Sequence, residues 1–373
     1  MQRHQIHPLL APVPGTERHI HSFHYGPSLP QGKVYIQASL HADELPGMLV
    51  AWHLKQRLAE LEAAGRLRSE IVLVPVANPA GLDQVLMDIP LGRYELQSGQ
   101  NFNRNFLDLS EQIGDELEGK LNNDPAHNLQ LIRRHLREML AAQVPTTQLH
   151  SQRLILQTLA CDADVVLDLH CDYEAVAHLY TTPEAWQQVE PLARYLGAQA
   201  SLLATDSGGL SFDECFTLLW WKLQQRFEHC FAIPQGGFSV TLELRGLGDV
   251  SHKHAEHDCQ ALIDYLIDFG AIDGESSPLP ALLYPATPLA GVEPVATPVG
   301  GLLVFSAKPG DYLNAGQLIA EVIDPISDRL TPVYCTNAGL LYARTLQRMA
   351  TAGMVIAHVA GQEAYRSGYL LSP

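Results

Sequence analysis

His41 and Glu44 stand three residues apart, directly after the apolar run KVYIQAS at 33–39. Zinc binds imidazole nitrogen and carboxylate oxygen, and a catalytic zinc site uses three protein ligands. Residues three apart on the first turn of a helix share a face, so these two side chains could reach one ion. The same spacing recurs at His135 and Glu138 within RRHLREML, where a solvated helix face explains it. The first pair alone therefore indicates either a metal site or ordinary helix-start chemistry.

A second histidine closes another apolar run, DADVVLDLH at 162–170. If this run and 33–39 are parallel strands of one sheet, His170 and His41 lie at the same edge, where ligands of open α/β sheets collect. The alternative is a hydrogen-bonded histidine at the edge of the core, which is the commoner case for a single residue.

A turn-forming stretch, NFNRNF at 101–106, places Arg104 between asparagines. A guanidinium group presents a fork that matches a carboxylate, and the amide of Asn103 adds donors. The stretch therefore indicates either a carboxylate-binding loop or an asparagine-rich turn with a surface arginine.

Glu243 lies inside the apolar run SVTLELRG. A glutamate is costly to bury unless something pairs with it or uses it. Beside a metal-activated water it would serve as a general base. The alternative is a salt bridge to Arg245, because strand alternation puts these two residues on one face.

Composition limits the classes of function. The chain has 373 residues, of which 46% are hydrophobic and 17% charged, with a net charge of −17. This composition fills a core, and so acidic a surface disfavours nucleic-acid binding. Neither an 18-residue apolar stretch nor an apolar signal-peptide segment is present, so we expect a cytoplasmic protein without a membrane partner. Six cysteines without a C-x-x-C pair predict buried thiols.

Strand-like and helix-like patterns alternate over the first 275 residues. We expect an α/β fold with a mixed, mostly parallel central sheet and helices on both faces. The expected strands are 33–39, 70–77, 162–170, 197–205 and 238–244, and the expected helices lie within 45–61, 127–142, 149–160, 212–229 and 259–272.

The pattern changes after Ser276, where prolines are dense and helical periodicity ends. Short apolar runs with PG, AG and GG turns then predict an all-β segment. We expect a catalytic domain at 1–275, a linker at 276–287 and a small all-β C-terminal domain at 288–373.

The order of these motifs resembles the zinc carboxypeptidase superfamily and, within it, the succinylglutamate desuccinylase/aspartoacylase family, over about residues 30–272. The β-rich C-terminal segment resembles that family's C-terminal domain, whose fold is similar to biotinyl/lipoyl carrier domains. The segment IDPISDRLTPVYC lacks a lysine, so a swinging-arm attachment is not expected. We expect instead a lid or an assembly surface.

The resemblance implies a role for each motif. One Zn²⁺ ion per chain would be held by His41, Glu44 and His170, and Glu243 would be the general base and later the proton donor. Asn103 and Arg104 would grip a substrate carboxylate. Arg93, in IPLGRYEL, is the nearest match to the family's oxyanion-stabilising arginine.

The sequence departs from the family pattern at two places. Asn101 stands where the family often has an aspartate that orients the first zinc histidine. Residues 110–155 form a long charged helical insertion, which could narrow the mouth of the site or build an oligomer contact. A further histidine cluster invites a second metal site, but we interpret it as the polar start of the last helix: His252, His254 and His257.

The expected function is zinc-dependent hydrolysis of the amide bond of a small N-acyl amino acid. The insertion and the C-terminal segment favour a homo-oligomer over a monomer. One alternative is a zinc carboxypeptidase or peptide amidase with the same residues. The alternative of another class is a non-catalytic small-molecule binding protein, which would have no need of a buried base at Glu243. The glycine turn in TDSGGLSFDECF (205–216) is expected to approach the site.

Overall fold

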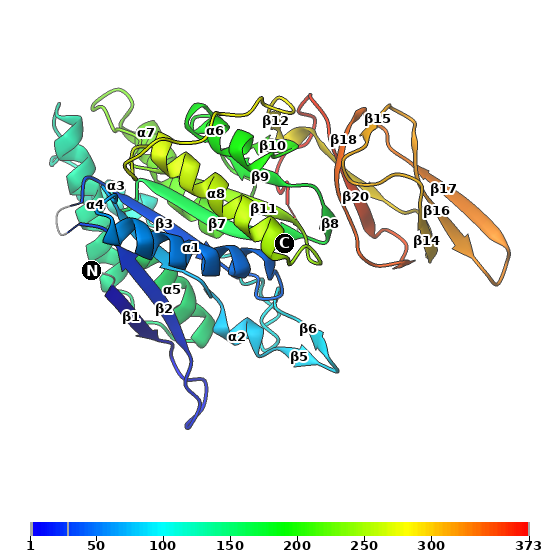
Figure 1. The fold of residues 1–373 in the computed structure, drawn as a ribbon, viewed down its shortest axis with the longest axis horizontal. Coiled ribbons are helices and arrows are strands. Elements are labelled where there is room, and N and C mark those ends of the chain that lie inside the picture. Colours follow the sequence, from blue (N-terminus) through cyan, green and yellow to red (C-terminus); the bar gives the residue numbers. More distant parts are fainter. Residues whose placement is uncertain (1–2, 28–29, 372–373) are drawn as a thin grey trace.

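The computed structural model of the chain describes residues 3–27 and 30–371. Its main feature is a nine-stranded sheet with the order β1-β2-β4-β3-β7-β11-β9-β10-β12 (Figure 1). The strands are β1 (Arg3–Pro8), β2 (His19–Tyr25), β3 (Lys33–Ala38), β4 (Glu70–Val74), β7 (Val165–Asp172), β9 (His178–Thr181), β10 (Ala200–Leu203), β11 (Phe238–Gly246) and β12 (Thr287–Pro288).

The centre of this sheet is parallel. β3 pairs in parallel with both β4 and β7, and β7 pairs in parallel with β11. Residues of β3 and β7 are buried on both faces, which explains why their sequences are almost continuously apolar. Antiparallel pairs occur between β1 and β2, β2 and β4, and β11 and β9. The expected mixed, mostly parallel sheet is therefore confirmed.

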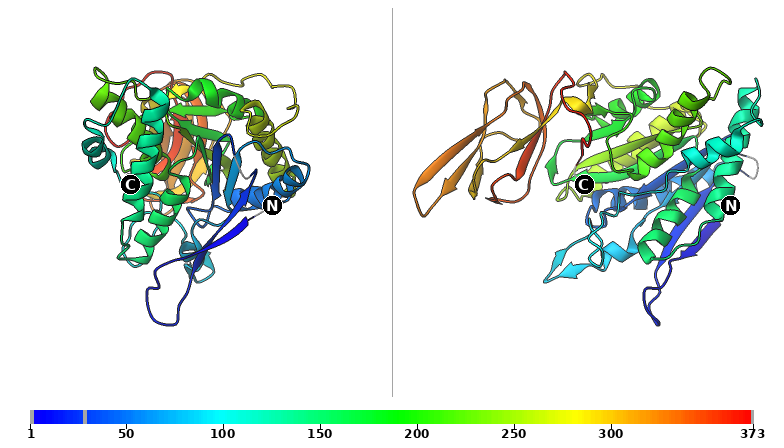
Figure 2. Two further views of the ribbon diagram at one scale, coloured as in Figure 1. Left: turned by 90° about the vertical axis from the view of Figure 1, so that its left-hand side faces the viewer. Right: turned by 180° about the vertical axis from the view of Figure 1, so that it is seen from behind.

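Helices cover both faces of the sheet (Figures 1 and 2). One face packs against α1 (Pro46–Ala63), α6 (Trp186–Leu196) and α8 (His252–Asp268) in a single apolar cluster. The other face packs against α5 (Gln148–Ala160) and α7 (Phe212–Phe227). Outside them lie α3 (Ser110–Leu117) and α4 (Pro125–Ala141), which form a third apolar cluster with α7.

The segment between β4 and α3 carries little regular structure. It contains the short helix α2 (Pro79–Leu82) and a hairpin of β5 (Val85–Leu86) and β6 (Ile89–Pro90). The loop after this hairpin returns to the sheet, because Ala42 donates a backbone hydrogen bond to Gly92 at 3.0 Å. A side chain at Gly92 would clash with the backbone of residues 42 and 43, so only glycine allows this approach.

The C-terminal segment folds into two small sheets around their own apolar cluster. One sheet has the order β13-β20-β18-β15 and the other β17-β16-β14-β19. The short β8 (Glu174–Ala175) pairs with β18 and so ties the two parts of the chain together. The bounds are η1 (Leu289–Gly291), β13 (Val292–Ala296), β14 (Gly301–Phe305), β15 (Tyr312–Leu313), β16 (Leu318–Asp324), β17 (Arg329–Tyr334), β18 (Gly339–Arg344), β19 (Met349–Ala350) and β20 (Val355–Ala360).

Some local structure differs from the expectations. The N-terminal hairpin β1–β2 and α6 were not predicted from the sequence pattern, and α8 begins at His252, earlier than its apolar pattern. All six cysteines are free, and four of them are buried. Over residues 3–27 and 30–371, no helix combines the length and the apolar character that a membrane crossing requires.

Candidate metal centre and its cavity

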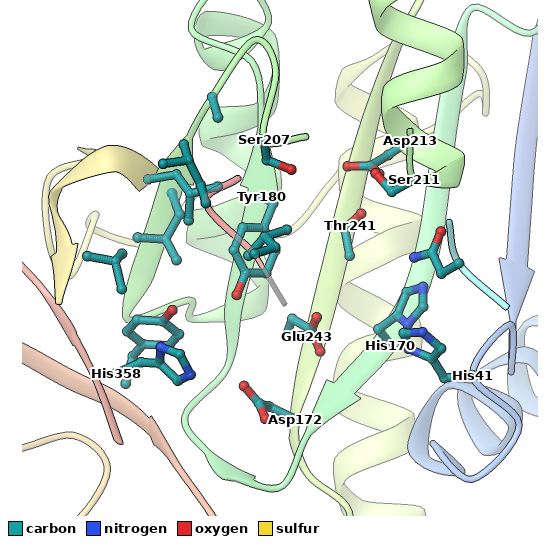
Figure 3. Close-up of a pocket in the computed structure, with 18 of the residues that line it drawn as sticks. His41, His170, Asp172, Tyr180, Ser207, Ser211, Asp213, Thr241, Glu243 and His358 are labelled. Carbon is teal, nitrogen blue, oxygen red and sulfur yellow. The ribbon is translucent and has the colours of Figure 1, made fainter. Parts of the chain in front are cut away.

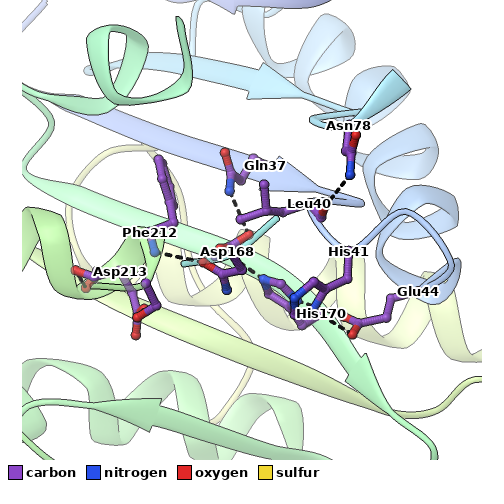
Figure 4. A network of polar contacts seen from close by, with 12 residues as sticks. Gln37, Leu40, His41, Glu44, Asn78, Asp168, His170, Phe212 and Asp213 are labelled. Atoms are coloured by element: carbon purple, nitrogen blue, oxygen red, sulfur yellow. Dashed lines mark hydrogen bonds and ion pairs between the residues drawn. The ribbon is translucent and has the colours of Figure 1, made fainter. Parts of the chain in front are cut away.

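Three side chains from two strand ends converge at the carboxyl edge of the sheet (Figure 4). His41 and Glu44 follow β3, and His170 lies near the end of β7. Their ligand atoms all lie within 4.8 Å of one another, and all three residues are buried. Glu44 bridges the two rings: Oε1 is 2.9 Å from His41 Nδ1, and Oε2 is 2.7 Å from His170 Nδ1. The structure thus brings together the three expected metal ligands.

The local geometry of the first pair differs from the expectation. α1 begins at Pro46, so His41 and Glu44 precede the helix and do not share its first turn. A tight turn replaces the helix, with the Glu44 N–H donating to the His41 carbonyl at 3.2 Å. The proline fixes the start of the helix because it has no N–H to give to a preceding turn.

The outer nitrogen of each ring meets a polar side chain. His41 Nε2 lies 2.8 Å from Asn101 Oδ1, which also accepts a hydrogen bond from the backbone N–H of Asn103 at 2.9 Å. Since that oxygen is an acceptor, His41 Nε2 must be the donor, and Nδ1 keeps its lone pair. His170 Nε2 lies 3.0 Å from Asp168 Oδ2, and Gln37 holds the other oxygen of Asp168 at 2.9 Å. Such outer partners orient metal-binding histidines in proteins.

The donor set fits a divalent cation. Burial lowers the pKa of His41 to about 4, which favours a neutral ring. Because Nε2 carries the proton, the lone pair of Nδ1 faces a carboxylate oxygen of Glu44. Burial would raise the pKa of Glu44, but His41 and His170 outweigh it and keep the carboxylate ionised. Burial would lower the pKa of His170, whereas Asp168 and Glu44 raise it above its ordinary value. Two imidazoles and one carboxylate at this spacing are the ligands that zinc prefers in catalytic sites.

Glu243 lies beside this group. It occupies the position on β11 that pairs with His170 on β7. Its Oε2 is buried and finds no hydrogen-bond partner among the described residues. Burial, followed by the nearby charge of Glu44, raises the pKa of Glu243 well above its ordinary value.

The alternative explanation for Glu243, a salt bridge to Arg245, is wrong. Arg245 has a positive φ of 69°, and the pairing of β11 with β7 shifts register between Glu243 and Gly246. This bulge breaks the alternation on which the alternative depended. Arg245 instead forms an ion pair with Asp258 of α8, with Nη1 3.2 Å from Oδ1.

Arg93 reaches the same group from the loop that packs on residues 42 and 43. Its Nη1 lies 3.1 Å from Glu44 Oε1 and 3.4 Å from His41 Nδ1. Burial would lower the pKa of Arg93, but Glu44 outweighs it, so the group is a cation. A positive charge is therefore available next to the three expected ligands.

Asn103 and Arg104 lie on the wall of the same cavity. Asn103 Oδ1 accepts a hydrogen bond from the Phe212 N–H at 2.8 Å, and Arg104 Nη1 donates to the Asn103 carbonyl at 2.7 Å. Gly209 packs on the Arg104 side chain, where a Cβ would come within 2.8 Å of its Cδ. As expected, the segment 205–216 approaches the site.

The helical insertion at 110–155 supports the site only from outside. Among the described residues that line the cavity, none comes from this segment, so it does not narrow the mouth. Arg153 of α5 instead donates to the Asn101 carbonyl at 2.9 Å and to Gln100 Oε1 at 3.1 Å. The insertion thus holds the loop that carries Asn101 and Arg104.

The cavity has a volume of about 350 Å³ and two unlike ends (Figure 3). The metal-ligand end is polar, and its wall includes Ser211, Asp213, Thr241 and Glu243. The C-terminal segment supplies another part of the wall, where Arg344, Thr345, Gln347 and His358 accompany apolar residues. The apolar lining residues outside the metal-ligand end include Ala204, Tyr342, Met354, Val355, Leu370 and Leu371, and behind them lie the almost fully buried Leu202, Leu289, Val292 and Ile356.

Several of these residues were missed by the sequence analysis. Asp168, His170 and Asp172 share one face of β7, and Thr241 shares a face of β11 with Glu243, so period-two alternation could have identified them. Thr241 is 6% exposed, and its Oγ1 has no hydrogen-bond partner within the described chain. For the residues of the C-terminal segment, the sequence carries no such signal.

The other histidines behave as interpreted. His252 contacts His53 at 3.0 Å, His254 N–H donates to the Ser251 cap, and His257 contacts Asp258 at 3.2 Å. His135 and the exposed Glu138 lie 3.6 Å apart on a solvated face of α4. Within the described parts of the chain, only His41, Glu44 and His170 form a group of three that could hold a metal ion.

Known proteins resemble the chain both in sequence and in fold. The sequence profile of the succinylglutamate desuccinylase/aspartoacylase catalytic domain matches residues 30–268. No curated protein sequence matches the chain. A crystal structure of a succinylglutamate desuccinylase/aspartoacylase family protein from Shewanella amazonensis is 25% identical, with a TM-score of 0.85 over 96% of this chain and 98% of that one.

Two further structures share the fold at lower identity. A succinylglutamate desuccinylase/aspartoacylase from Shewanella frigidimarina is 23% identical, with a TM-score of 0.83 over 97% of both chains. The product-bound ectoine utilization protein EutE (DoeB) from Ruegeria pomeroyi is 18% identical, with a TM-score of 0.67 over 96% of this chain and 95% of that one. Both similarities extend over the C-terminal segment as well as the large sheet.

Proposed function

The chain belongs to the succinylglutamate desuccinylase/aspartoacylase family, and on this premise we propose that it is a zinc-dependent deacylase that hydrolyses the amide bond of an N-acyl amino acid. The observation that carries the proposal is the convergence of His41, Glu44 and His170 beside Glu243, whose buried Oε2 has no hydrogen-bond partner among the described residues. A buried carboxylate oxygen without a partner is costly, and a proton-transfer role accounts for it.

We assign the metal ligands as His41 Nδ1, Glu44 and His170 Nδ1, holding one Zn²⁺ ion per chain. Bound zinc supplies Lewis-acid chemistry, because it polarises a carbonyl oxygen and acidifies water. Asn101 and Asp168 would orient the two rings so that each Nδ1 points toward the ion. It also excludes bulk water, since all three ligands are buried.

Glu243 moves the proton in the proposed reaction. Its carboxylate accepts a proton from the attacking water and then donates it to the leaving nitrogen. Its environment favours the proton-accepting step, because burial and the nearby charge of Glu44 raise the pKa of Glu243 above its ordinary value. Its place on β11, in register with His170, keeps it at a fixed position relative to the ligands.

Two arginines would hold the negative charges of the substrate and of the reaction. Arg104, with Asn103, binds the substrate carboxylate and so determines which bond reaches the reactive centre. Arg93 stabilises the oxyanion that develops on the carbonyl oxygen. Its 3.1 Å contact with Glu44 supports this assignment, because it places the guanidinium next to the ligands.

The C-terminal segment supports a small substrate over a peptide. We propose domains at 1–275 and 288–373, joined by the linker 276–287, with the second domain related to biotinyl/lipoyl-like folds. Residues of this domain, such as Tyr342, line the cavity, and a wall on that side favours a small substrate over a long chain. A carboxypeptidase or peptide amidase is therefore the second choice.

The test combines metal analysis with hydrolysis. We expect one zinc ion per purified chain by mass spectrometry, and release of free amino acid from N-acetyl or N-succinyl amino acids but not from dipeptides. A chelator should stop the release, and added zinc should restore it. Full activity without metal would refute the zinc assignment, and a metal-loaded protein inert toward every compound would favour a binding protein.

A further inference from the structure

The segment 100–107 links several parts of the proposed site. It carries three of the residues assigned above: Asn101, Asn103 and Arg104. It also contacts the loop that supplies the proposed oxyanion cation, because the Phe102 N–H donates to the Arg93 carbonyl at 3.1 Å. A shift of this segment would therefore move the groups proposed for metal orientation, carboxylate binding and oxyanion stabilisation together.

Two residues of α5, about one helical turn apart, hold this segment at both ends. Near its start, Arg153 Nη2 donates to the Asn101 carbonyl at 2.9 Å, and Nη1 donates to Gln100 Oε1 at 3.1 Å. At its end, the Gln157 amide donates to the Leu107 carbonyl and accepts from the Leu107 N–H, each at 3.0 Å. Residues four apart lie on one face of a helix, so a single helix face fixes both ends of the segment.

The Arg153 guanidinium is buried against neutral oxygen atoms. Arg153 is 7% exposed, and its Nε has no hydrogen-bond partner among the described residues. Burial, opposed in part by the charge of Glu95, lowers the pKa of Arg153 to about 10, so the group is still a cation at neutral pH. A buried cation whose acceptors are a carbonyl and an amide oxygen is costly for folding, and a role in the site accounts for its presence.

We infer that Arg153 is a positioning residue of the site and that it acts through the backbone of Asn101. Its hydrogen bond fixes the peptide group next to the Asn101 side chain, whose Oδ1 lies 2.8 Å from His41 Nε2. Arg153 thereby keeps His41 oriented for metal binding and Arg104 placed for the substrate carboxylate. Gln157 supports the far end of the same segment. The inference rests on the proposed deacylase function and extends it to residues outside the cavity wall.

The test replaces Arg153 in the full chain and measures metal binding and kinetics separately. Arg153→Met removes both hydrogen bonds at a similar side-chain length. We expect the Kd for zinc, measured by competition with a chelator, to rise by about tenfold. We expect kcat/KM for the N-acyl amino acid that the protein cleaves to fall by about 10–100-fold, because the reacting groups are displaced. Arg153→Lys keeps a cation that can reach one acceptor and should restore part of both values.

Arg133 on α4 provides the matched control. It belongs to the same helical insertion and does not line the cavity. Its Nη2 donates to Asp164 Oδ1 and to the Gly236 carbonyl, each at 2.6 Å, and its Nε also lacks a partner within the described chain. Arg133→Met should lower the free energy of unfolding, measured by urea titration, and leave the zinc Kd and KM unchanged. If Arg153→Met likewise changes stability alone, the inference is overturned.

A double substitution tests the route through Asn101. Arg153→Met should change the zinc Kd by less than about twofold when Asn101 is already alanine, because the contact that Arg153 supports is then absent. Additive effects of the two substitutions would overturn this route.

A readout without turnover separates the inference from the proposed function. Hydrogen exchange of the backbone amides in 100–107 should be faster in Arg153→Met than in the parent protein. Gln157→Ala should have the same effect from the other end, which keeps the test open if Arg153→Met does not fold. Unchanged exchange in both variants would overturn the inference alone. A parent protein that binds zinc and cleaves no N-acyl amino acid would contradict the deacylase function alone.

Discussion

Glu243 and His170 occupy paired positions on the adjacent parallel strands β11 and β7. Residues in register on neighbouring strands share a face of the sheet, so backbone hydrogen bonds fix the proposed base relative to one proposed metal ligand. The pairing of β3 with β7 brings the loop carrying His41 and Glu44 to the same edge. The central strands thus position the chemistry, while loops supply the groups that would contact substrate.

Replacing Glu243 should separate catalysis from metal binding. Glu243→Gln keeps the shape of the side chain but cannot accept a proton, so we expect kcat to fall by about 10²–10⁴-fold. Metal content should stay at that of the parent protein, measured by mass spectrometry. Glu256→Gln, on the exposed face of α8, is the control for a lost carboxylate. A Glu243→Gln variant with near-parent kcat would contradict the proposed role.

Asn101 should govern metal affinity through His41. Asn101→Ala removes the acceptor of the 2.8 Å contact to His41 Nε2 and of the 2.9 Å bond from the Asn103 N–H. We expect the Kd for zinc, measured by competition with a chelator, to rise by about 10–100-fold. Asn101→Asp restores an acceptor with more charge and should bind zinc at least as tightly as the parent. Equal Kd values for the alanine variant and the parent would rule out this orienting role.

Thr241 offers a test in which stability and activity move in opposite directions. Its Oγ1 is buried without a partner in the described chain. Thr241→Val should therefore leave the free energy of unfolding unchanged or raise it by up to about 1 kcal/mol. If the hydroxyl contacts substrate, kcat/KM should fall by about tenfold, because the bound substrate loses a hydrogen bond. Denaturant melts and kinetics measure the two effects, with Thr241→Ser expected to retain activity. A simultaneous loss of stability would indicate a structural role instead.

Asp162 should make the junction between β3 and α4 sensitive to acid. Its carboxylate lies 2.5 Å from Lys33 Nζ and 3.1 Å from Arg137 Nη1. Burial would raise the pKa of Asp162, but the two cations outweigh it and lower the pKa below its ordinary value of 3.8. The two ion pairs of Asp162 therefore stabilise the fold above the unfolded-state pKa of this carboxyl group. Their contribution is lost as the pH falls through the lowered pKa.

The Asp162→Asn variant measures this contribution. We expect it to lose about 1 kcal/mol of unfolding free energy at pH 7, and the difference from the parent should shrink as the solution is acidified below pH 4. Urea titrations at a series of pH values supply both numbers. A difference that does not depend on pH would contradict the electrostatic explanation.

The sequence predicted the parts of the site that depend on short-range regularity. Apolar runs marked β3, β7 and β11, and polar residues at their ends marked His41, His170 and Glu243. Two local predictions were wrong because of the backbone conformation. The turn before Pro46 replaces the expected helical turn, and the positive φ of Arg245 breaks the expected strand alternation. The C-terminal part of the cavity wall could not be predicted, because only long-range packing brings Leu370 to the apolar cluster that contains Leu202.

The return of the chain at residues 361–371 gives the last prediction. Tyr369 packs on Gly208, whose φ is +86° and whose missing side chain leaves room for the tyrosine ring. Tyr369→Ala should loosen the segment that carries Leu370 and Leu371, which line the cavity. We expect KM for the N-acyl amino acid that the protein cleaves to rise. Gly208→Ala should have the same effect from the other side of the contact. Tyr312→Ala, at a 52% exposed position away from the cavity, is the control. Loosening this segment should remove apolar surface that the bound substrate would otherwise cover. If both variants at the contact leave KM unchanged, this segment does not shape the cavity.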